Sequence, residues 1–272
     1  MPDVTPAPVV VGIDGSAAAT NAAVWAVAEA VHRNATLRLV YVALGDAASE
    51  RTDESAGLER EFGIASLRAA SAAVAATGQR VKVETATVYG DSSAVLIEQS
   101  RSADLVCIGS TGVGAMAGRV LGSTVLDVAE HALCSVAVIR TPHAEPMAGP
   151  DWIVVSIDES TDDADVVGFA MSQASLRQAP VMAVGAWSAE VGETPYDVLD
   201  RHVEGWRIRY PGVRICAVTD RGTVARFLAE DAVDSVQLAV IRSSDVRQVA
   251  HILGPHHPSF IAHGYCSVAI VR

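Results

Sequence analysis

A glycine-rich segment of the chain, Gly109–Thr124 (GSTGVGAMAGRVLGST), has the composition of a phosphate-binding loop. It contains five glycines, one arginine and no lysine, and it follows the apolar run DLVCI. Glycine lets the backbone turn with positive φ and approach a ligand closely, so that main-chain amides point at phosphate oxygens. Gly122, Ser123 and Thr124 then begin a helix, where free amides and the helix dipole favour an anion. Arg119 would add positive charge.

A carboxylate follows a second apolar run near the amino terminus. Asp14 lies directly after VVVGI, in the sequence GIDGS. A carboxylate in that place can accept hydrogen bonds from a ribose hydroxyl or an adenine amine. Asp14 and Gly109 both stand at the end of an expected strand, so they line one crevice if the two strands are neighbours in a parallel sheet.

Plainer interpretations of these residues remain open. Ser123 would serve only as a helix N-cap, and Asp14 would be an ordinary turn acid before Ser16 caps its own helix. The inner glycines of the segment would form only a flexible loop. The joint placement of both segments at strand ends favours a binding site.

Other nucleotide motifs fit the segment less well. A Walker loop needs a lysine followed by Ser or Thr, and the only lysine of the chain is Lys82. A dinucleotide fingerprint belongs in the first strand–helix turn, which reads GIDGSAAA, whereas GVGAMAG follows the fourth strand and misses the spacing by one residue. Both motifs are therefore rejected.

Charge and hydropathy exclude several classes of protein. The net charge of −12 and the pI near 5.0 argue against a nucleic-acid or anionic-membrane surface, so we expect a small ligand or another protein as partner. The amino terminus lacks an export signal and no apolar run is long enough to cross a bilayer, which predicts a cytoplasmic protein.

None of the four cysteines stands at CxxC spacing, so neither a zinc site nor a redox motif is indicated. We expect the acidic segment Gly45–Gly57 to be a solvated loop rather than a metal site.

Apolar, β-rich runs alternate with helical patterns along the chain, which predicts βαβ units and a doubly wound parallel sheet of the α/β class. Short runs such as VVVGI lack alternation because a strand covered on both faces has no solvated side. The expected strands of the first half are Val9–Ile13, Leu37–Val42, Val81–Val88, Leu105–Ile108 and Ser135–Ile139. The expected helices lie near Ser16–Arg33, Leu58–Thr77, Ser92–Arg101 and Ser123–His131.

The two halves of the chain repeat one another, which indicates a tandem duplication. VVVGIDGS recurs as IVVSIDES, and HALCSVAVIR recurs as HGYCSVAIVR. The segments between these blocks share a layout in which Gly90 corresponds to Gly222. The expected domains are residues 1–142 and 153–272, joined by a Pro- and Gly-containing linker at 143–152.

With these features the chain resembles the universal stress protein family. ATP-binding members carry G-x2-G-x9-G-[ST], which Gly109, Gly112, Gly122 and Ser123 fill here. The Asp after the first strand and the closing strand CSVAVIR strengthen the resemblance, which covers nearly the whole chain as two tandem copies. It implies two doubly wound domains of the adenine nucleotide alpha hydrolase-like class, each a five-stranded parallel sheet in the order 3-2-1-4-5 with helices on both faces.

The resemblance also implies roles for individual residues. ATP is the expected ligand, with magnesium assisting. Asp14 would meet the ribose, while Val42 and the backbone near Ile13 and Ile108 would hold the adenine. The phosphates would be met by Gly112, Gly122, Ser123 and Thr124. Because the last strands pair between subunits in this family, the two halves are expected to dock as an internal pseudo-dimer, and a further homodimer remains open.

The second half departs from the glycine pattern. Its first two glycines are replaced by Arg242 and Asp245, and its last glycine is followed by Pro255. The arginine side chain would obstruct close approach of a ligand, the aspartate would repel phosphate, and proline has no amide to donate. We therefore expect one intact site in residues 1–140 and a degraded site in residues 150–272.

The resemblance implies a regulatory ATP-binding protein that changes shape or partner and so modulates growth or survival under stress. Its partner would be an unidentified regulatory protein. One alternative is a slow ATPase or nucleotidyl-transfer enzyme, although no acid or histidine within the motif takes the role of a catalytic base. Another alternative is a scaffold without bound nucleotide. The alanine-, valine- and arginine-rich composition fits a GC-rich bacterial genome.

Overall fold

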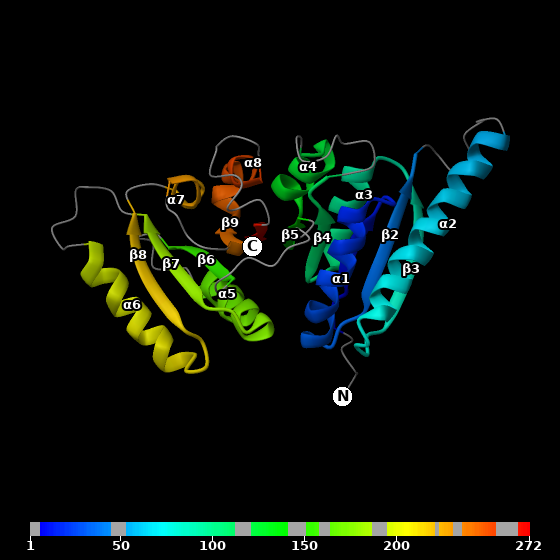
Figure 1. Ribbon diagram of the computed structural model, residues 1–272. Coiled ribbons are helices and arrows are strands. Elements are labelled where there is room, and N and C mark those ends of the chain that lie inside the picture. The colour runs from blue at the N-terminus through cyan, green and yellow to red at the C-terminus, as the bar shows by residue number, and fades with distance from the viewer. Residues whose placement is uncertain are drawn as a thin grey trace. The chain divides into compact units, whose positions relative to one another are not determined.

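The computed structural model divides the chain into two compact units, Met1–Thr141 and Pro142–Arg272 (Figure 1). The structure describes residues 6–44, 53–111, 121–140, 151–157, 164–186, 195–220, 223–230, 236–253 and 266–272. Each unit is an α/β domain, and the described strands within each unit all pair in parallel.

Five described strands form the sheet of the first unit. They are β1 (Val9–Ile13), β2 (Leu37–Ala43), β3 (Val83–Tyr89), β4 (Leu105–Gly109) and β5 (Ser135–Ile139). Their order across the sheet is β3-β2-β1-β4-β5, which confirms the predicted order 3-2-1-4-5. In the register between β1 and β4, Val9 lies opposite Leu105 and Val11 lies opposite Cys107. The strand that precedes Asp14 is therefore the neighbour of the strand that ends at Gly109.

Two pairs of helices cover this sheet. They are α1 (Ala17–His32) with α2 (Asp53–Ala76), and α3 (Ser92–Gln99) with α4 (Ser123–His131). Helix α1 contacts α2, and α3 contacts α4. From β1 the strands β2 and β3 are added on one side, and the chain then returns across the sheet to add β4 and β5 on the other side. Because crossovers between parallel strands are right-handed, this reversal of direction places the connecting helices on the opposite face. The two pairs therefore lie on opposite faces (Figure 1).

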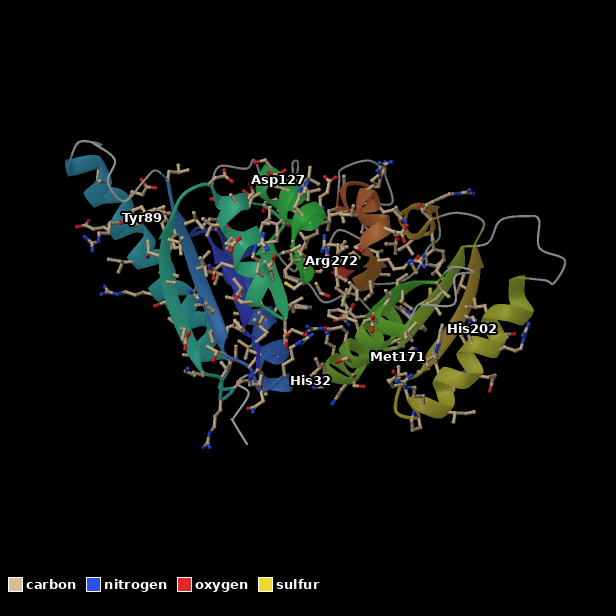
Figure 2. All side chains as sticks on the ribbon, turned by 180° about the vertical axis from the view of Figure 1, so that it is seen from behind. His32, Tyr89, Asp127, Met171, His202 and Arg272 are labelled. Atoms are coloured by element: carbon tan, nitrogen blue, oxygen red, sulfur yellow. The ribbon has the colours of Figure 1, made fainter. Side chains whose placement is uncertain are left out.

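The central strands are buried on both faces, which explains their unbroken apolar sequences. The side chains of Val9, Leu105 and Cys107 have no exposed surface. Full burial of one Val or Leu side chain contributes about 1.5–3 kcal/mol, so these strands form the core of the unit. Side chains at the outside, such as Tyr89 at the end of β3 and Asp127 on α4, are exposed (Figure 2).

Two residues fix the turn from β1 into α1. The Ser16 hydroxyl accepts a hydrogen bond from the Ala19 amide at 3.1 Å, which confirms the predicted N-cap. Gly15 has a φ of 86°, a left-handed conformation that other residues rarely adopt. A Cβ on Gly15 would also lie 2.7 Å from the ring of Phe62 in α2. The turn therefore requires glycine at this position.

One helix boundary differs from the sequence prediction. Helix α2 begins at Asp53 rather than at Leu58, so the expectation of a loop over Gly45–Gly57 is wrong for residues 53–57. The sequence DES at residues 53–55 is compatible with a helix start, because acidic residue types are common in the first turn of a helix. Residues 45–52 lie outside the described part of the chain. All other predicted boundaries of the first unit agree with the structure within two residues.

The second unit repeats this topology, so the predicted duplication of the fold is confirmed. Its strands are β6 (Trp152–Ile157), β7 (Val181–Ala186), β8 (Ile215–Asp220), β9 (Val236–Arg242) and β10 (Ser267–Val271). Its helices are α5 (Ala164–Arg177), α6 (Pro195–Arg209), α7 (Val224–Glu230) and α8 (Val249–Leu253), with the 3-10 segment η2 (Ser243–Gln248). The strand order β8-β7-β6-β9-β10 matches that of the first unit. No helix among the described residues has the length and hydrophobicity needed to cross a membrane.

Helix α2 approaches β2 closely at one glycine. A Cβ on Gly63 would lie 2.6 Å from the ring of Tyr41. That ring packs edge-on against Phe62, with ring centroids 6.2 Å apart. At Gly57 of the same helix, by contrast, no described atom lies within 4 Å of an added Cβ.

We expect Gly63→Ala to lower the free energy of unfolding of the first unit by about 1–3 kcal/mol, because the added methyl group overpacks against Tyr41. Gly57→Ala is the matched control and should raise stability by about 0.5–1 kcal/mol, since it only removes a flexible residue from the helix. Urea denaturation of both variants measures the two changes. Equal effects would contradict the described packing of α2 on β2.

Candidate functional site

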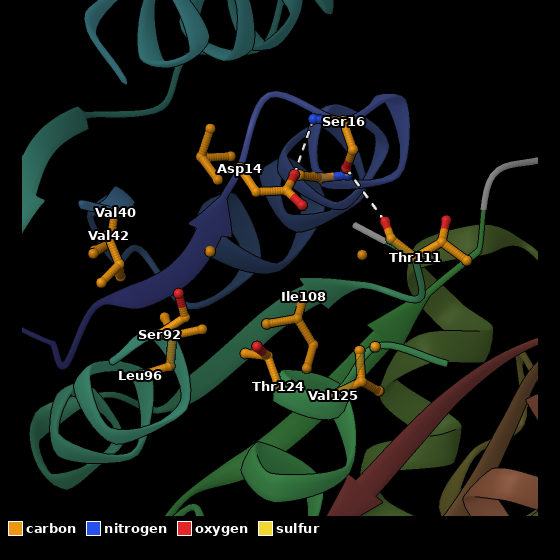
Figure 3. A pocket seen from close by; sticks show the side chains of 15 residues that line it. Asp14, Ser16, Val40, Val42, Ser92, Leu96, Ile108, Thr111, Thr124 and Val125 are labelled. Carbon is orange, nitrogen blue, oxygen red and sulfur yellow. Dashed lines mark hydrogen bonds between the residues drawn. The ribbon is translucent and has the colours of Figure 1, made fainter. Parts of the chain in front are cut away.

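A cavity in the first unit lies at the carboxyl ends of β1 and β4 (Figure 3). It holds about 660 Å³ of empty space, part of it open to solvent. The walls come from the ends of β1, β2 and β4 and from the first turns of α1, α3 and α4. This is the switch point of the doubly wound sheet, where the connections leave in opposite directions.

The cavity brings together most of the predicted ligand residues. Those that line it are Ile13, Asp14, Val42, Ile108, Gly109, Gly122 and Thr124. Ser123 does not line the cavity, because it is the first residue of α4 and its side chain is exposed. Gly112 and Arg119 lie outside the described residues, as does Pro255 of the second half.

Sequence reasoning missed the other residues of the wall. They are Gly12, Ser16, Ala19, Val40, Ser92, Leu96, Thr111 and Val125. Val40 carried a readable signal, because it lies two residues before Val42 and so faces the same side of β2. Leu96 and Val125 carried none, because helical periodicity does not separate the wall of a cavity from the core.

Asp14 lines the cavity at the end of β1 (Figure 3). Its Oδ1 accepts a hydrogen bond from the Ser16 amide at 2.9 Å, so the carboxylate also shapes the turn into α1. A carboxylate has about four lone-pair sites, so this hydrogen bond does not by itself exclude others. The interpretation of Asp14 as a turn acid is therefore correct, and it is compatible with a ligand contact.

Ser16 connects the ends of the two central strands. Its hydroxyl accepts from the Ala19 amide and donates to the carbonyl of Thr111 at 3.3 Å (Figure 3). Ser16 follows β1 and Thr111 follows β4, so this hydrogen bond joins the two sides of the cavity mouth. The sequence predicted that Ser16 caps α1, but it did not predict the hydrogen bond to Thr111.

Gly109 is required by packing within the protein. A Cβ on Gly109 would lie 2.6 Å from the backbone carbon of Ala18 and 2.7 Å from the backbone nitrogen of Ala19. These atoms belong to α1 and cannot move aside as a flexible side chain would. Close approach of a ligand, the reason expected from the sequence, is therefore not needed to explain this glycine.

Among the described residues, no close packing contact requires glycine at position 122. It is the N-cap of α4 with φ −64° and ψ 146°, and no side chain caps the helix. The interpretation of Ser123 as the N-cap is therefore wrong. Among the described atoms, a Cβ on Gly122 would meet only the side chain of Val125, at 3.9 Å. The space beside Gly122 suits an anion, which the amides and dipole at the helix start would favour.

The other end of the cavity is apolar (Figure 3). Val40, Leu96 and Ile108 are almost fully buried, and Val42 is partly exposed. These side chains form a wall of the kind on which a flat organic ring can pack. The cavity thus changes from apolar at β2 and α3 to polar at the start of α4.

Tyr41 lies between Val40 and Val42 on β2 but is not part of the cavity wall. Burial raises the pKa of its phenol, and the negative charges of Glu59 and Asp14 raise it further. The phenol therefore stays protonated and uncharged at physiological pH. Asp14 is then the only ionisable residue among the described residues of the wall. Across the described chain, no group of three or more His, Cys, Asp or Glu residues is placed to hold a metal ion.

In the second unit, protein side chains connect the elements that correspond to β4 and α3. Arg242 ends β9, and its Nη2 lies 3.4 Å from Oδ2 of Asp245. Gln248 donates from Nε2 to Oδ1 of Asp245 at 3.0 Å and accepts at Oε1 from the Ala225 amide at 3.2 Å. Ala225 lies at the start of α7. A network of Arg242, Asp245 and Gln248 thus links the end of β9 to the start of α7, the elements that correspond to β4 and α3 in the first unit.

Comparison with known proteins finds relatives over nearly the whole chain. The sequence profile of the Universal stress protein family matches residues 7–140. Universal stress protein Rv2624c of Mycobacterium tuberculosis is 42% identical over 267 residues, covering 97% of this chain and 96% of its own. Universal stress protein Rv2028c of the same organism is 36% identical over 271 residues, covering 98% and 96%. The crystal structure of a universal stress protein from Archaeoglobus fulgidus matches 98% of this chain and 97% of its own with a TM-score of 0.68 at 14% identity, a likeness of fold.

Gly109→Ala and Gly122→Ala add the same methyl group at two ends of one site, but we expect different effects on stability. The Gly109 variant should lose about 1–3 kcal/mol of unfolding free energy, because its methyl group meets the backbone of α1. The Gly122 variant should lose no more than about 1 kcal/mol, the cost of a poorer N-cap. Thermal or urea denaturation measures both. A loss at Gly122 as large as that at Gly109 would mean that protein atoms fill the space beside Gly122.

Asp245→Ala should lower the stability of the second unit by about 1–2 kcal/mol, because it leaves Arg242 and Gln248 without their shared acceptor. The control is Glu204→Ala, which removes another i,i+3 partner of an arginine. The side chains of Glu204 and Arg207 are 66% and 47% exposed, against 25% and 18% for Asp245 and Arg242. The control should therefore change stability by less than about 0.5 kcal/mol. Urea denaturation showing equal losses would contradict a structural role for the network.

Proposed function

The chain belongs to the universal stress protein family, and we propose that its first unit binds ATP and thereby regulates growth or survival under stress. The observation that supports this proposal is one cavity in which an apolar wall, a carboxylate and a helix start with glycine as its N-cap come together. These features suit the base, the sugar and the phosphates of a nucleotide, in that order. Bound nucleotide would change the conformation of the protein or its choice of a protein partner.

Asp14 is the proposed contact of the ribose, since it can accept hydrogen bonds from sugar hydroxyls while it holds the Ser16 amide. The adenine would lie against Val42 and Ile108, beside the backbone of Ile13. This arrangement uses the apolar end of the cavity for the base and its middle for the sugar.

The phosphates would meet the start of α4. Gly122 leaves room for them, the amides of Ser123 and Thr124 belong to the first turn, and the Thr124 hydroxyl lines the cavity. Gly112 and Arg119 are proposed to add an amide and a positive charge. Magnesium bound to the phosphates would offset the repulsion between them and Asp14.

The proposed role is binding rather than catalysis. Hydrolysis of ATP needs a group that orients and activates water. Among the described residues of the wall, the only acid is Asp14, which is assigned to the sugar, and there is no histidine. The second unit supports one nucleotide site per chain, because β9 ends in Arg242 where β4 ends in Gly109, and this arginine is paired with Asp245 rather than leaving room for a ligand.

Asp14→Asn tests the proposed sugar contact. Asparagine keeps an oxygen for the Ser16 amide but loses the charge and part of the acceptor capacity. We expect the affinity for ATP with magnesium to fall by about 1–3 kcal/mol, while the melting temperature stays close to that of the wild type. A fluorescence titration measures the affinity.

Asp104→Asn is the control for this substitution, because it removes the same charge from the same unit. Asp104 is exposed and directly precedes β4, so it lies at the amino edge of the sheet, away from the cavity. Its substitution should leave the affinity unchanged. Unchanged affinity in Asp14→Asn would refute the ribose contact, and equal losses in both variants would assign the effect to net charge.

A further inference from the structure

The hydroxyl of Ser92 is a polar group at the apolar end of the cavity. Ser92 is the first residue of α3, and it lines the cavity together with Val40, Val42 and Leu96 (Figure 3). The residue is half-buried. Nothing in the ligand roles described so far uses this hydroxyl.

The start of α3 does not use the hydroxyl either. Asp91 is the N-cap, and its Oδ1 accepts from the Ser93 hydroxyl at 2.6 Å and from the Ala94 amide at 2.9 Å. These two hydrogen bonds, that of Ser93 first, hold the pKa of Asp91 below its usual value, so the cap stays ionised. In the described part of the chain, the Ser92 hydroxyl makes no hydrogen bond.

The other serine of the wall behaves differently. The Ser16 hydroxyl is engaged both by the Ala19 amide and by the Thr111 carbonyl. Of the two serines of the described wall, Ser92 is therefore the one whose hydroxyl can both donate a hydrogen bond to a ligand and accept one from it.

The second unit gives an internal comparison. With Gly90 corresponding to Gly222, the position of Ser92 is taken by Val224, which is 1% exposed. In that unit the network of Arg242, Asp245 and Gln248 links the end of β9 to the start of α7, where Val224 lies. The hydroxyl thus occurs in the unit in which the structure describes a cavity, and its counterpart in the other unit is a buried apolar residue.

We infer that Ser92 is a specificity-determining residue that hydrogen-bonds the amine or a six-membered-ring nitrogen of the nucleotide base. The inference rests on the proposed nucleotide binding and extends it to recognition of the base. The surrounding valine and leucine side chains pack against any flat ring of suitable size, so shape alone selects weakly among bases. The Ser92 hydroxyl adds a contact that only a base with hydrogen-bonding groups can make.

The test compares ATP with benzimidazole riboside 5′-triphosphate, which keeps the bicyclic shape, sugar and phosphates but lacks the amine and the nitrogens of the six-membered ring. Ser92→Ala should weaken binding of ATP roughly three- to tenfold, the effect of one net hydrogen bond, and leave binding of the benzimidazole analogue unchanged. Ser92→Thr keeps the hydroxyl and should retain most of the affinity for ATP. Fluorescence competition on the full chain measures all of these affinities.

Ser93→Ala is the matched control, because it removes the neighbouring hydroxyl, which bonds to Asp91 rather than facing the cavity. Its affinity for ATP should equal that of the wild type. Equal losses in Ser92→Ala and Ser93→Ala would assign the effect to the helix start and overturn the inference. So would an unchanged affinity for ATP in Ser92→Ala, or an equal loss for both ligands, although ATP binding itself would stand. Failure of the wild type to bind either triphosphate would refute the proposed function together with this inference.

Discussion

The close contact between β4 and the first turn of α1 is the constraint on which the rest of the site depends. At Gly109 the strand lies so near the backbone of Ala18 and Ala19 that no side chain fits between them. This approach fixes how the ends of β1 and β4 lie side by side and allows Ser16 to bond across to Thr111. The carboxylate after β1 and the helix start after β4 then face one cavity rather than two separate surfaces.

The two units show what happens to this geometry when the glycine is replaced. Strand order is the same in both, but β9 ends in Arg242 where β4 ends in Gly109. A half-buried guanidinium needs acceptors, which Asp245 provides, and Gln248 continues the network to the start of α7. Protein side chains therefore supply in the second unit the connections that a bound molecule would supply in the first. The duplicated fold thus keeps its strand order while the residues at the end of the fourth strand differ between the two copies.

Much of the fold could be predicted from the sequence because burial and turns leave local signals. Continuous apolar runs mark strands covered on both faces, and Ser16 marks a helix start by its type and position. The sequence could not show why glycine is needed at each position, because that depends on contacts between distant segments. A Cβ on Gly109 would clash with α1, about ninety residues away in the sequence, whereas a Cβ on Gly122 would meet only Val125 among the described atoms. Ser92 was missed for a similar reason: only the three-dimensional neighbours show that its hydroxyl lies on a cavity wall. The early start of α2 was missed because an acidic stretch is compatible with a loop and with a helix start alike.

We propose that the cavity of the first unit binds an adenine nucleotide and that the corresponding part of the second unit does not. Native mass spectrometry of the full chain, titrated with ATP and magnesium, tests this most directly because it counts bound nucleotides per chain. We expect saturation at a single nucleotide per chain. A chain that stays free of nucleotide at saturating ATP, or one that takes up two nucleotides with equal affinity, would contradict it.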